Sequence, residues 1–108
     1  MAQAILCGKS IDATRAAKSV SVTASVATSA WVADSTYTDY THKATVTVNG
    51  VTASNNIIVG LAANATSAQE EACATASVQC KAQGANSITL YAKSIPTTAL
   101  NITVMILG

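Results

Sequence analysis

The C-terminal part of this chain alternates apolar and polar side chains in three separate runs. The runs are residues 78–83, 88–93 and 100–106. A period of two is typical of β-strands that turn one face inward. Residues 84–86 (Gly-Ala-Asn) suit a tight hairpin between the first two runs, and Pro96 interrupts the chain before the third. The pattern predicts an antiparallel meander whose last strand is central to its sheet.

The same alternation occurs twice upstream, in residues 20–26 and 43–48, and a short apolar run follows at 57–59. The second run enters Asn49-Gly50, the strongest turn dipeptide of the chain. One helix is predicted where Ser67 and Glu70 fit a capping box. Together these elements predict an all-β fold, a jelly-roll-like antiparallel β-sandwich of about seven strands with one short helix, over residues 19–108.

Charged residues make up only 10% of the chain, against roughly 25% in an average protein. The net charge is +1, and the aliphatic core is lean, with 23 Leu, Ile and Val residues and no Phe. A monomer with so few charges would have a poorly protected surface. The composition therefore predicts one small domain that assembles obligately with other protein.

Two features predict where copies of the chain meet. Ala72 and Ala76 share one face of the predicted helix, and small side chains suit close packing against a sheet or a second chain. Residues 104–107 are apolar on both faces, which a sheet with one solvated side does not require. Either a subunit contact or a helix of the same chain covers the second face. We expect the subunit contact, at Met105 and Leu107.

The first 18 residues differ from the rest, because they hold four of the eleven charged residues and show no clean period. They form either an arm that docks on a larger partner, or an edge strand or frayed terminus. The arm hypothesis predicts docking contacts at Ile5, Leu6, Ile11 and Arg15.

A polar loop is expected over residues 28–41, and it holds Trp31, Tyr37 and Tyr40 together with Asp34 and Asp39. These three rings are candidate glycan contacts, since an aromatic ring stacks on a sugar face while a carboxylate accepts from sugar hydroxyls. The alternative, which we favour, is that the rings plug the ends of the sheets or an interface.

Several classes of function have no support in the residues. Catalysis needs a positioned acid, base or nucleophile, and no motif surrounds the single histidine, His42. Cys7, Cys73 and Cys80 lack metal-ligand spacing, so we expect buried thiols, with a Cys73–Cys80 bridge as the alternative. No basic patch, phosphate loop or apolar stretch of about 18 residues occurs. We expect no enzyme activity, cofactor, metal, nucleic-acid partner or membrane insertion.

Three segments resemble a C-terminal domain shared by tailed-bacteriophage virion proteins, namely fibre, head-fibre and tail-appendage proteins. The segments are residues 45–53 (TVTVNGVTA), 78–90 (VQCKAQGANSITL) and 95–108 (IPTTALNITVMILG). The resemblance covers roughly residues 44–108, and Trp31 fits a Trp shortly before it. It implies a compact, commonly trimeric β domain displayed on a virion, and it brings no catalytic residue.

The family's domains usually end a long chain with a shaft, whereas few residues precede the domain here. This departure favours a small decoration or head-fibre subunit on the virion surface, a homotrimer held on the major capsid protein by its N-terminal arm. One alternative is the tip domain of a tail appendage, which binds a glycan of the host surface. Another is a subunit that seals a tail or neck junction.

Overall fold

The computed structural model describes residues 2–3 and 20–107 of the 108-residue chain. Within these ranges it contains eight strands, one α-helix and one short 3₁₀-helix. In chain order they are β1 (Ala2–Gln3), β2 (Val20–Val26), η2 (Thr28–Ala30), β3 (Val32–Tyr37), β4 (Tyr40–Thr47), β5 (Ile57–Leu61), α1 (Ser67–Ala76), β6 (Gln79–Gly84), β7 (Ser87–Ala92) and β8 (Leu100–Ile106).

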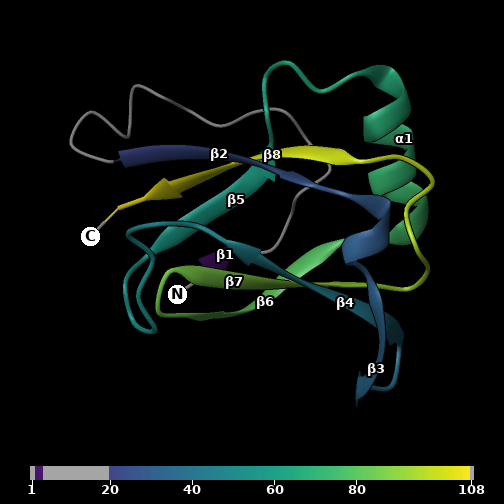
Figure 1. The fold of residues 1–108 in the computed structure, drawn as a ribbon, viewed down its shortest axis with the longest axis horizontal. Helices are drawn as coiled ribbons and strands as arrows, with labels where there is room; N and C mark the ends of the chain where they lie inside the picture. The colour runs from purple at the N-terminus through teal and green to yellow at the C-terminus, as the bar shows by residue number, and fades with distance from the viewer. Residues whose placement is uncertain (1, 4–19, 108) are drawn as a thin grey trace.

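The strands form two four-stranded sheets that pack face to face (Figure 1). Sheet A has the order β1-β5-β8-β2, and sheet B has the order β3-β4-β7-β6. Neighbouring strands are antiparallel, except that the two residues of β1 pair in parallel with β5. The predicted all-β sandwich with one short helix is confirmed, and β8 is central to its sheet as expected.

The predicted meander is wrong, because β8 does not join the hairpin that precedes it. β6 and β7 pair across a turn at Ala85 and Asn86, where Asn86 has a φ of 55°. On its other side β7 pairs with β4, which leaves it no free edge for β8. The chain therefore crosses to sheet A after β7, and β8 inserts between β5 and β2.

Residues 28–41, expected to be a loop, contain η2 and the strand β3. Five of the six residues of β3 are exposed, so neither face of the strand is buried. A strand without a buried face needs no alternation of apolar and polar residues, and the usual signal is absent. β3 forms because it pairs with β4, from Val32 opposite Lys43 to Tyr37 opposite Tyr40, with a register shift in between.

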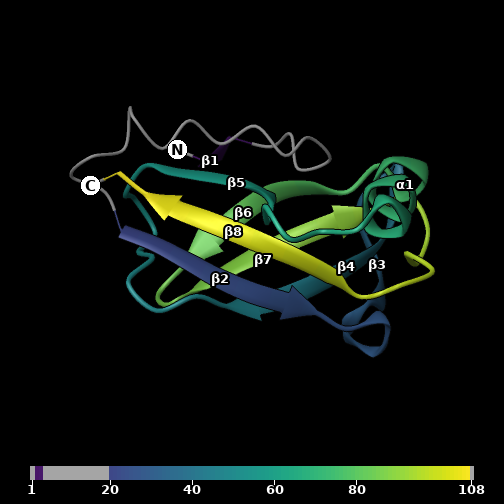
Figure 2. The same cartoon turned by 90° about the horizontal axis from the view of Figure 1, so that it is seen from above.

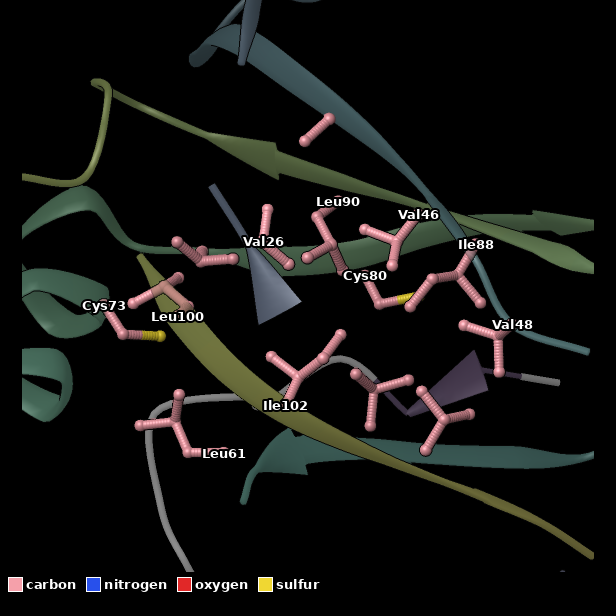
Figure 3. Close-up of a cluster of buried hydrophobic side chains, with 14 of the residues drawn as sticks. Val26, Val46, Val48, Leu61, Cys73, Cys80, Ile88, Leu90, Leu100 and Ile102 are labelled. Atoms are coloured by element: carbon pink, nitrogen blue, oxygen red, sulfur yellow. The ribbon is translucent and has the colours of Figure 1, made fainter. Parts of the chain in front are cut away.

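Aliphatic side chains from both sheets fill the space between them, where they point toward one another (Figure 3). The labelled ones include Val26, Leu61, Leu100 and Ile102 of sheet A, and Val46, Ile88 and Leu90 of sheet B. Burying one such side chain contributes about 1.5–3 kcal/mol. The shared core therefore holds the two sheets together and leaves their outer faces free to differ.

Helix α1 closes one end of the sandwich (Figure 2). Its buried residues are Ala72, Cys73 and Ala76, which all belong to the core cluster. Small side chains at these positions let the helix approach the sheets closely. Of the two alternatives for the alanine stripe, packing within this chain is the one observed.

The helix cap lies one residue before the predicted one. Thr66 is the N-cap, and its Oγ1 accepts the N–H of Gln69 at 3.2 Å, while Ser67 is the first helical residue. The side chain of Gln69 turns toward β8, where its Oε1 accepts the N–H of Asn101 at 3.0 Å. The start of the helix is thereby tied to the start of the central strand of sheet A.

The turn between β6 and β7 and the loop between β4 and β5 lie at the end of the sandwich opposite α1 (Figure 1), and Asn86 joins them. Its Oδ1 accepts the N–H of Gly50 at 3.0 Å, and its own N–H donates to the carbonyl oxygen of Val51 at 2.7 Å. Gly50 has a φ of 97°, and a Cβ there would lie 3.2 Å from Cδ1 of Ile106. The turn predicted at residues 49–50 is present, and it leads the chain from sheet B to sheet A.

Candidate functional site

The two sheets differ in charge. The strands of sheet A contain no Asp, Glu, Lys, Arg, His, Tyr or Cys residue at all. The strands of sheet B contain Asp34, His42, Lys43 and Lys81, and Lys93 directly follows β7. All three tyrosines of the chain also lie on sheet B. Sheet B is therefore where a polar ligand would find specific partners.

The tyrosines and two of the lysines gather in one group, which we call the tyrosine–lysine cluster: Tyr37, Tyr40, Tyr91, Lys81 and Lys93. The ring of Tyr37 stands edge-on to that of Tyr91, with centroids 4.8 Å apart, and to that of Tyr40, with centroids 6.5 Å apart. The ammonium group of Lys81 lies 4.9 Å from the ring centroids of both Tyr37 and Tyr40. The Lys93 ammonium lies 6.0 Å from the ring of Tyr40.

Three strands bring this cluster together. Tyr37 and Tyr40 are directly opposite each other at the turn of the β3–β4 hairpin. Tyr91 is opposite Lys43 on β4, which places it beside that hairpin. Lys81 lies at the register shift of β6, between Cys80 and Ala82. An ammonium group near a ring face is attracted by the ring's negative potential, so each contact fixes a lysine close to the tyrosines.

The lysines of sheet B are not equally neutralised. Lys43 forms a salt bridge with Asp34, with Nζ 3.3 Å from Oδ1, whereas neither Lys81 nor Lys93 has a carboxylate partner among the described residues. A hydrogen bond from the Thr36 N–H, together with Lys43, holds the pKa of Asp34 below its ordinary value of 3.8. Asp34 is therefore paired with Lys43, and no carboxylate of the described residues forms a salt bridge with the lysines of the cluster.

Trp31 does not belong to this site. Its ring is 5% exposed and lies in the core cluster, and its buried Nε1 meets no hydrogen-bond acceptor in the part of the chain that the structure describes. A side chain at this depth cannot stack on a sugar, so the prediction of a glycan contact at Trp31 is wrong. Its large ring is instead part of the core cluster.

Tyr37 and Tyr40, the other two candidate glycan contacts, do lie together and are 37% exposed and half-buried, respectively. Tyr91, Lys81 and Lys93 were not predicted as site residues from the sequence. The signal was in the alternation, since all three occupy polar positions of the runs at 78–83 and 88–93. What the sequence did not show was that β3 and β4 lie beside that hairpin.

The reactive side chains outside the cluster include His42, Cys73 and Cys80 among the described residues. Nδ1 of His42 lies 2.8 Å from Oγ1 of Thr41, a hydroxyl that donates to the carbonyl of Lys93. Cys73 and Cys80 are buried thiols with no bridge between them, and burial raises the pKa of Cys80 to about 11. Within residues 2–3 and 20–107, no three His, Cys, Asp or Glu residues gather in a group that would hold a metal ion.

The predicted subunit contacts have different surroundings. Ala72 and Ala76 are buried in the core, and Met105 is only 6% exposed, so they offer little surface to a second chain. Leu107 is 45% exposed. Helix α1 does not cover Met105, because the helix lies at the start of β8 and Met105 lies near the end of this strand (Figure 2).

The N-terminal arm lies mostly outside the described residues, and with it the predicted docking contacts Ile5, Leu6, Ile11 and Arg15. Its described residues, Ala2–Gln3, form the edge strand β1 of sheet A.

Comparisons with protein-family models, with curated proteins and with solved structures give no match to this chain. None of the described helices is long and apolar enough to cross a membrane. The inference about function therefore depends on the fold, the two outer faces and the residues themselves.

Proposed function

We propose that this chain is a non-enzymatic structural protein of a bacteriophage virion surface, a small capsid-exterior decoration or head-fibre subunit that forms a homotrimer. The observation that carries the proposal is the contrast between the two sheets, because the strands of sheet A have no ionisable side chain. Surfaces that face water in a lone protein normally carry charges of both signs. A sheet without any is suited to meet other protein.

Exposed apolar side chains support an assembly. Val32, Ile95 and Leu107 are 52%, 45% and 45% exposed, in a chain with only 10% charged residues. Leu107 follows β8 at the end of sheet A, where we place the contact around the three-fold axis. In a trimer, three-fold symmetry repeats each weak contact three times. Both the assembly and its attachment to a capsid are then stronger than one contact alone would make them.

The resemblance to phage fibre and head-fibre domains supports the virion assignment, and it lies in segments that form strands of the sandwich. Its segments, residues 45–53, 78–90 and 95–108, include most of the β6–β7 hairpin and all of β8. Of these elements, β7 and β8 are interior strands of sheets B and A, and β6 is the edge strand that pairs with β7. The resemblance therefore concerns residues that hold the sandwich together, which suits a structural module with no catalytic centre.

The proposal is tested on phage particles from a host culture that expresses this chain. Antibodies against the purified protein should label the outside of intact particles, and quantitative mass spectrometry should find the chain in a copy number divisible by three. Serum absorbed with the purified protein is the control. If the chain stays in the particle-free supernatant, the virion assignment is wrong.

A second candidate function is the tip domain of a tail appendage that binds a host glycan, and the tyrosine–lysine cluster is the observation that favours it. Lys81 and Lys93 have no carboxylate partner among the described residues and lie beside tyrosine rings. Such an arrangement suits an acidic sugar, whose ring stacks on tyrosine while its carboxylate pairs with lysine.

Binding of the full chain to an array of neutral and acidic glycans tests this second candidate. Lys81→Gln should abolish binding to acidic glycans, whereas Lys43→Gln, on the same sheet but already paired with Asp34, should retain most of it. Trp31→Ala is unsuitable as a test because it disturbs the core. Equal loss in both lysine variants would remove the cluster from consideration.

A further inference from the structure

The three long edge strands of the sandwich are protected to different degrees. An edge strand presents unpaired N–H and C=O groups, and proteins usually guard it with a bulge or a charge. β3 has a register shift and carries Asp34, and β6 has a register shift with Lys81 inside it. β2 has neither, because all seven of its residues pair with β8 in one unbroken register.

The open edge of β2 is well suited to pair with another strand. Its sequence, Val-Ser-Val-Thr-Ala-Ser-Val, contains no proline, glycine or charge and is rich in β-branched residues. Six of its seven residues are exposed or half-buried, and Val20 is 59% exposed. β2 ends sheet A, and no described strand lies along its outer edge (Figure 2).

The pattern of β2 is also complementary to itself. In an antiparallel pair centred on Thr23, this residue lies opposite its own copy, Val20 opposite Val26, Ser21 opposite Ser25, and Val22 opposite Ala24. Every apolar residue thus meets an apolar one, and every hydroxyl meets a hydroxyl. Such cross-strand pairs stabilise a sheet, whereas a slip by one residue would place hydroxyls against valines and reverse the faces.

From these observations we infer that β2 binds the β2 strand of a second copy of this chain and joins two sheets A into one continuous sheet. A two-fold axis perpendicular to the sheet at Thr23 creates this contact and keeps both cores on the same side. Pairing of β2 with β3 or β6 of another copy would instead bring Asp34 or Lys81, and a register shift, against an uncharged regular edge.

This two-fold contact is separate from the three-fold contact proposed above and does not depend on it. If both exist and the two-fold axes cross the three-fold axis at right angles, trimers join in pairs and the particle contains six chains. If only the β2 contact exists, the particle contains two. Loss of the β2 contact halves the mass in both cases, whereas loss of the three-fold contact reduces the mass of the six-chain particle to a third.

Cysteine cross-linking of the full chain tests the contact and its register, in a Cys7→Ser background because Cys73 and Cys80 are buried. Directly opposite residues of an antiparallel pair have Cα atoms about 4.5–5.5 Å apart, within the range of a disulfide. Thr23→Cys should therefore give a covalent dimer as the main product of mild oxidation. Ser21→Cys should cross-link only when mixed with Ser25→Cys, its expected partner.

Thr45→Cys, an exposed threonine on the interior strand β4 of sheet B, is the matched cross-linking control. In a parallel experiment Thr23→Lys should halve the mass measured by light scattering, because two lysines would face each other, while Thr45→Lys should leave it unchanged. Circular dichroism checks that both variants are folded. The inference is overturned if Thr23→Cys cross-links no better than Thr45→Cys, if Ser21→Cys cross-links alone, or if Thr23→Lys keeps the wild-type mass.

Discussion

Sheet A and sheet B contribute to one core, but their remaining side chains belong to different kinds of surface. The strands of sheet A consist of apolar and uncharged polar residues, with no ionisable group. Sheet B carries every tyrosine, a salt bridge and two lysines without a carboxylate partner among the described residues. The edges follow the same division, since β2 is regular and uncharged while β3 and β6 are shifted in register and charged.

The difference shows how a chain with few charges can use them. Charges and bulges protect a β-sandwich from unwanted edge pairing, and among the described strands only those of sheet B have them. The unprotected sheet is then available for contacts with other copies, and the protected sheet for water or a ligand. The two sheets should behave alike in their shared core and differently on their outer surfaces.

The largest effects are expected in the shared core. Ile102→Ala in sheet A and Leu90→Ala in sheet B should each lower the free energy of unfolding by about 2–5 kcal/mol, because both side chains are fully buried. Thr103→Ala and Thr89→Ala, their partly exposed neighbours, are the controls and should cost far less. Urea unfolding at a fixed protein concentration measures all four. If one sheet lost its structure in a separate transition, the idea of a common core would fail.

Salt should affect binding at the two outer surfaces differently. In about 1 M NaCl the Debye length falls to roughly 3 Å, so contacts between exposed charges are screened. Self-association through sheet A should persist, because its strands have no charges to screen. Any binding of acidic glycans to the tyrosine–lysine cluster should weaken strongly over the same range. Light scattering and glycan binding at low and high salt check both, and dissociation of the assembly by salt would contradict the division.

A smaller effect is expected from the cluster itself. Lys81→Met removes the ammonium group from two tyrosine rings but keeps an apolar side chain, and an exposed cation–π contact contributes about 0.5–1 kcal/mol. The variant should unfold at slightly lower urea concentration than wild type, while Lys81→Arg, which keeps the charge, should not. A destabilisation as large as that of a core variant would mean that the cluster is part of the framework.

The smallest effect concerns Asp34. Because its pKa is lowered in the folded state, its charged form stabilises the protein at pH values above 3.8, the ordinary value. That contribution is lost as the pH falls through the folded pKa. The stability difference between wild type and Asp34→Asn should therefore be present at neutral pH and disappear in acid. Urea unfolding at several pH values checks this, and a difference that grew in acid would have the wrong sign.

Local patterns predicted the strands that bury one face. Residues 20–26 form β2 as expected, and the runs at 78–83, 88–93 and 100–106 correspond to β6, β7 and β8 within about one residue. β3 was missed because it buries neither face. The sheet to which β8 belongs was also missed, because alternation reports a strand's faces and carries no information about its neighbours.

The candidate site was predictable only in part, for the same reason. Tyr37 and Tyr40 are neighbours in sequence and were expected together, but Tyr91, Lys81 and Lys93 reach them through pairings between distant strands. Trp31 is an aromatic residue in a polar segment, as ligand contacts often are. Its burial depends on tertiary packing, which a local sequence pattern does not report. The two lysines were therefore missed because they are distant in sequence from Tyr37 and Tyr40, and Trp31 was wrongly assigned to the site.

The central claim is that copies of this chain complete one another through the uncharged sheet A. Sedimentation equilibrium of the purified full chain over a wide concentration range tests it most directly. We expect a mass that is a multiple of three chains of 10.9 kDa, and six chains if the β2 contact is also formed. A well-folded species of 10.9 kDa at every concentration would contradict the claim.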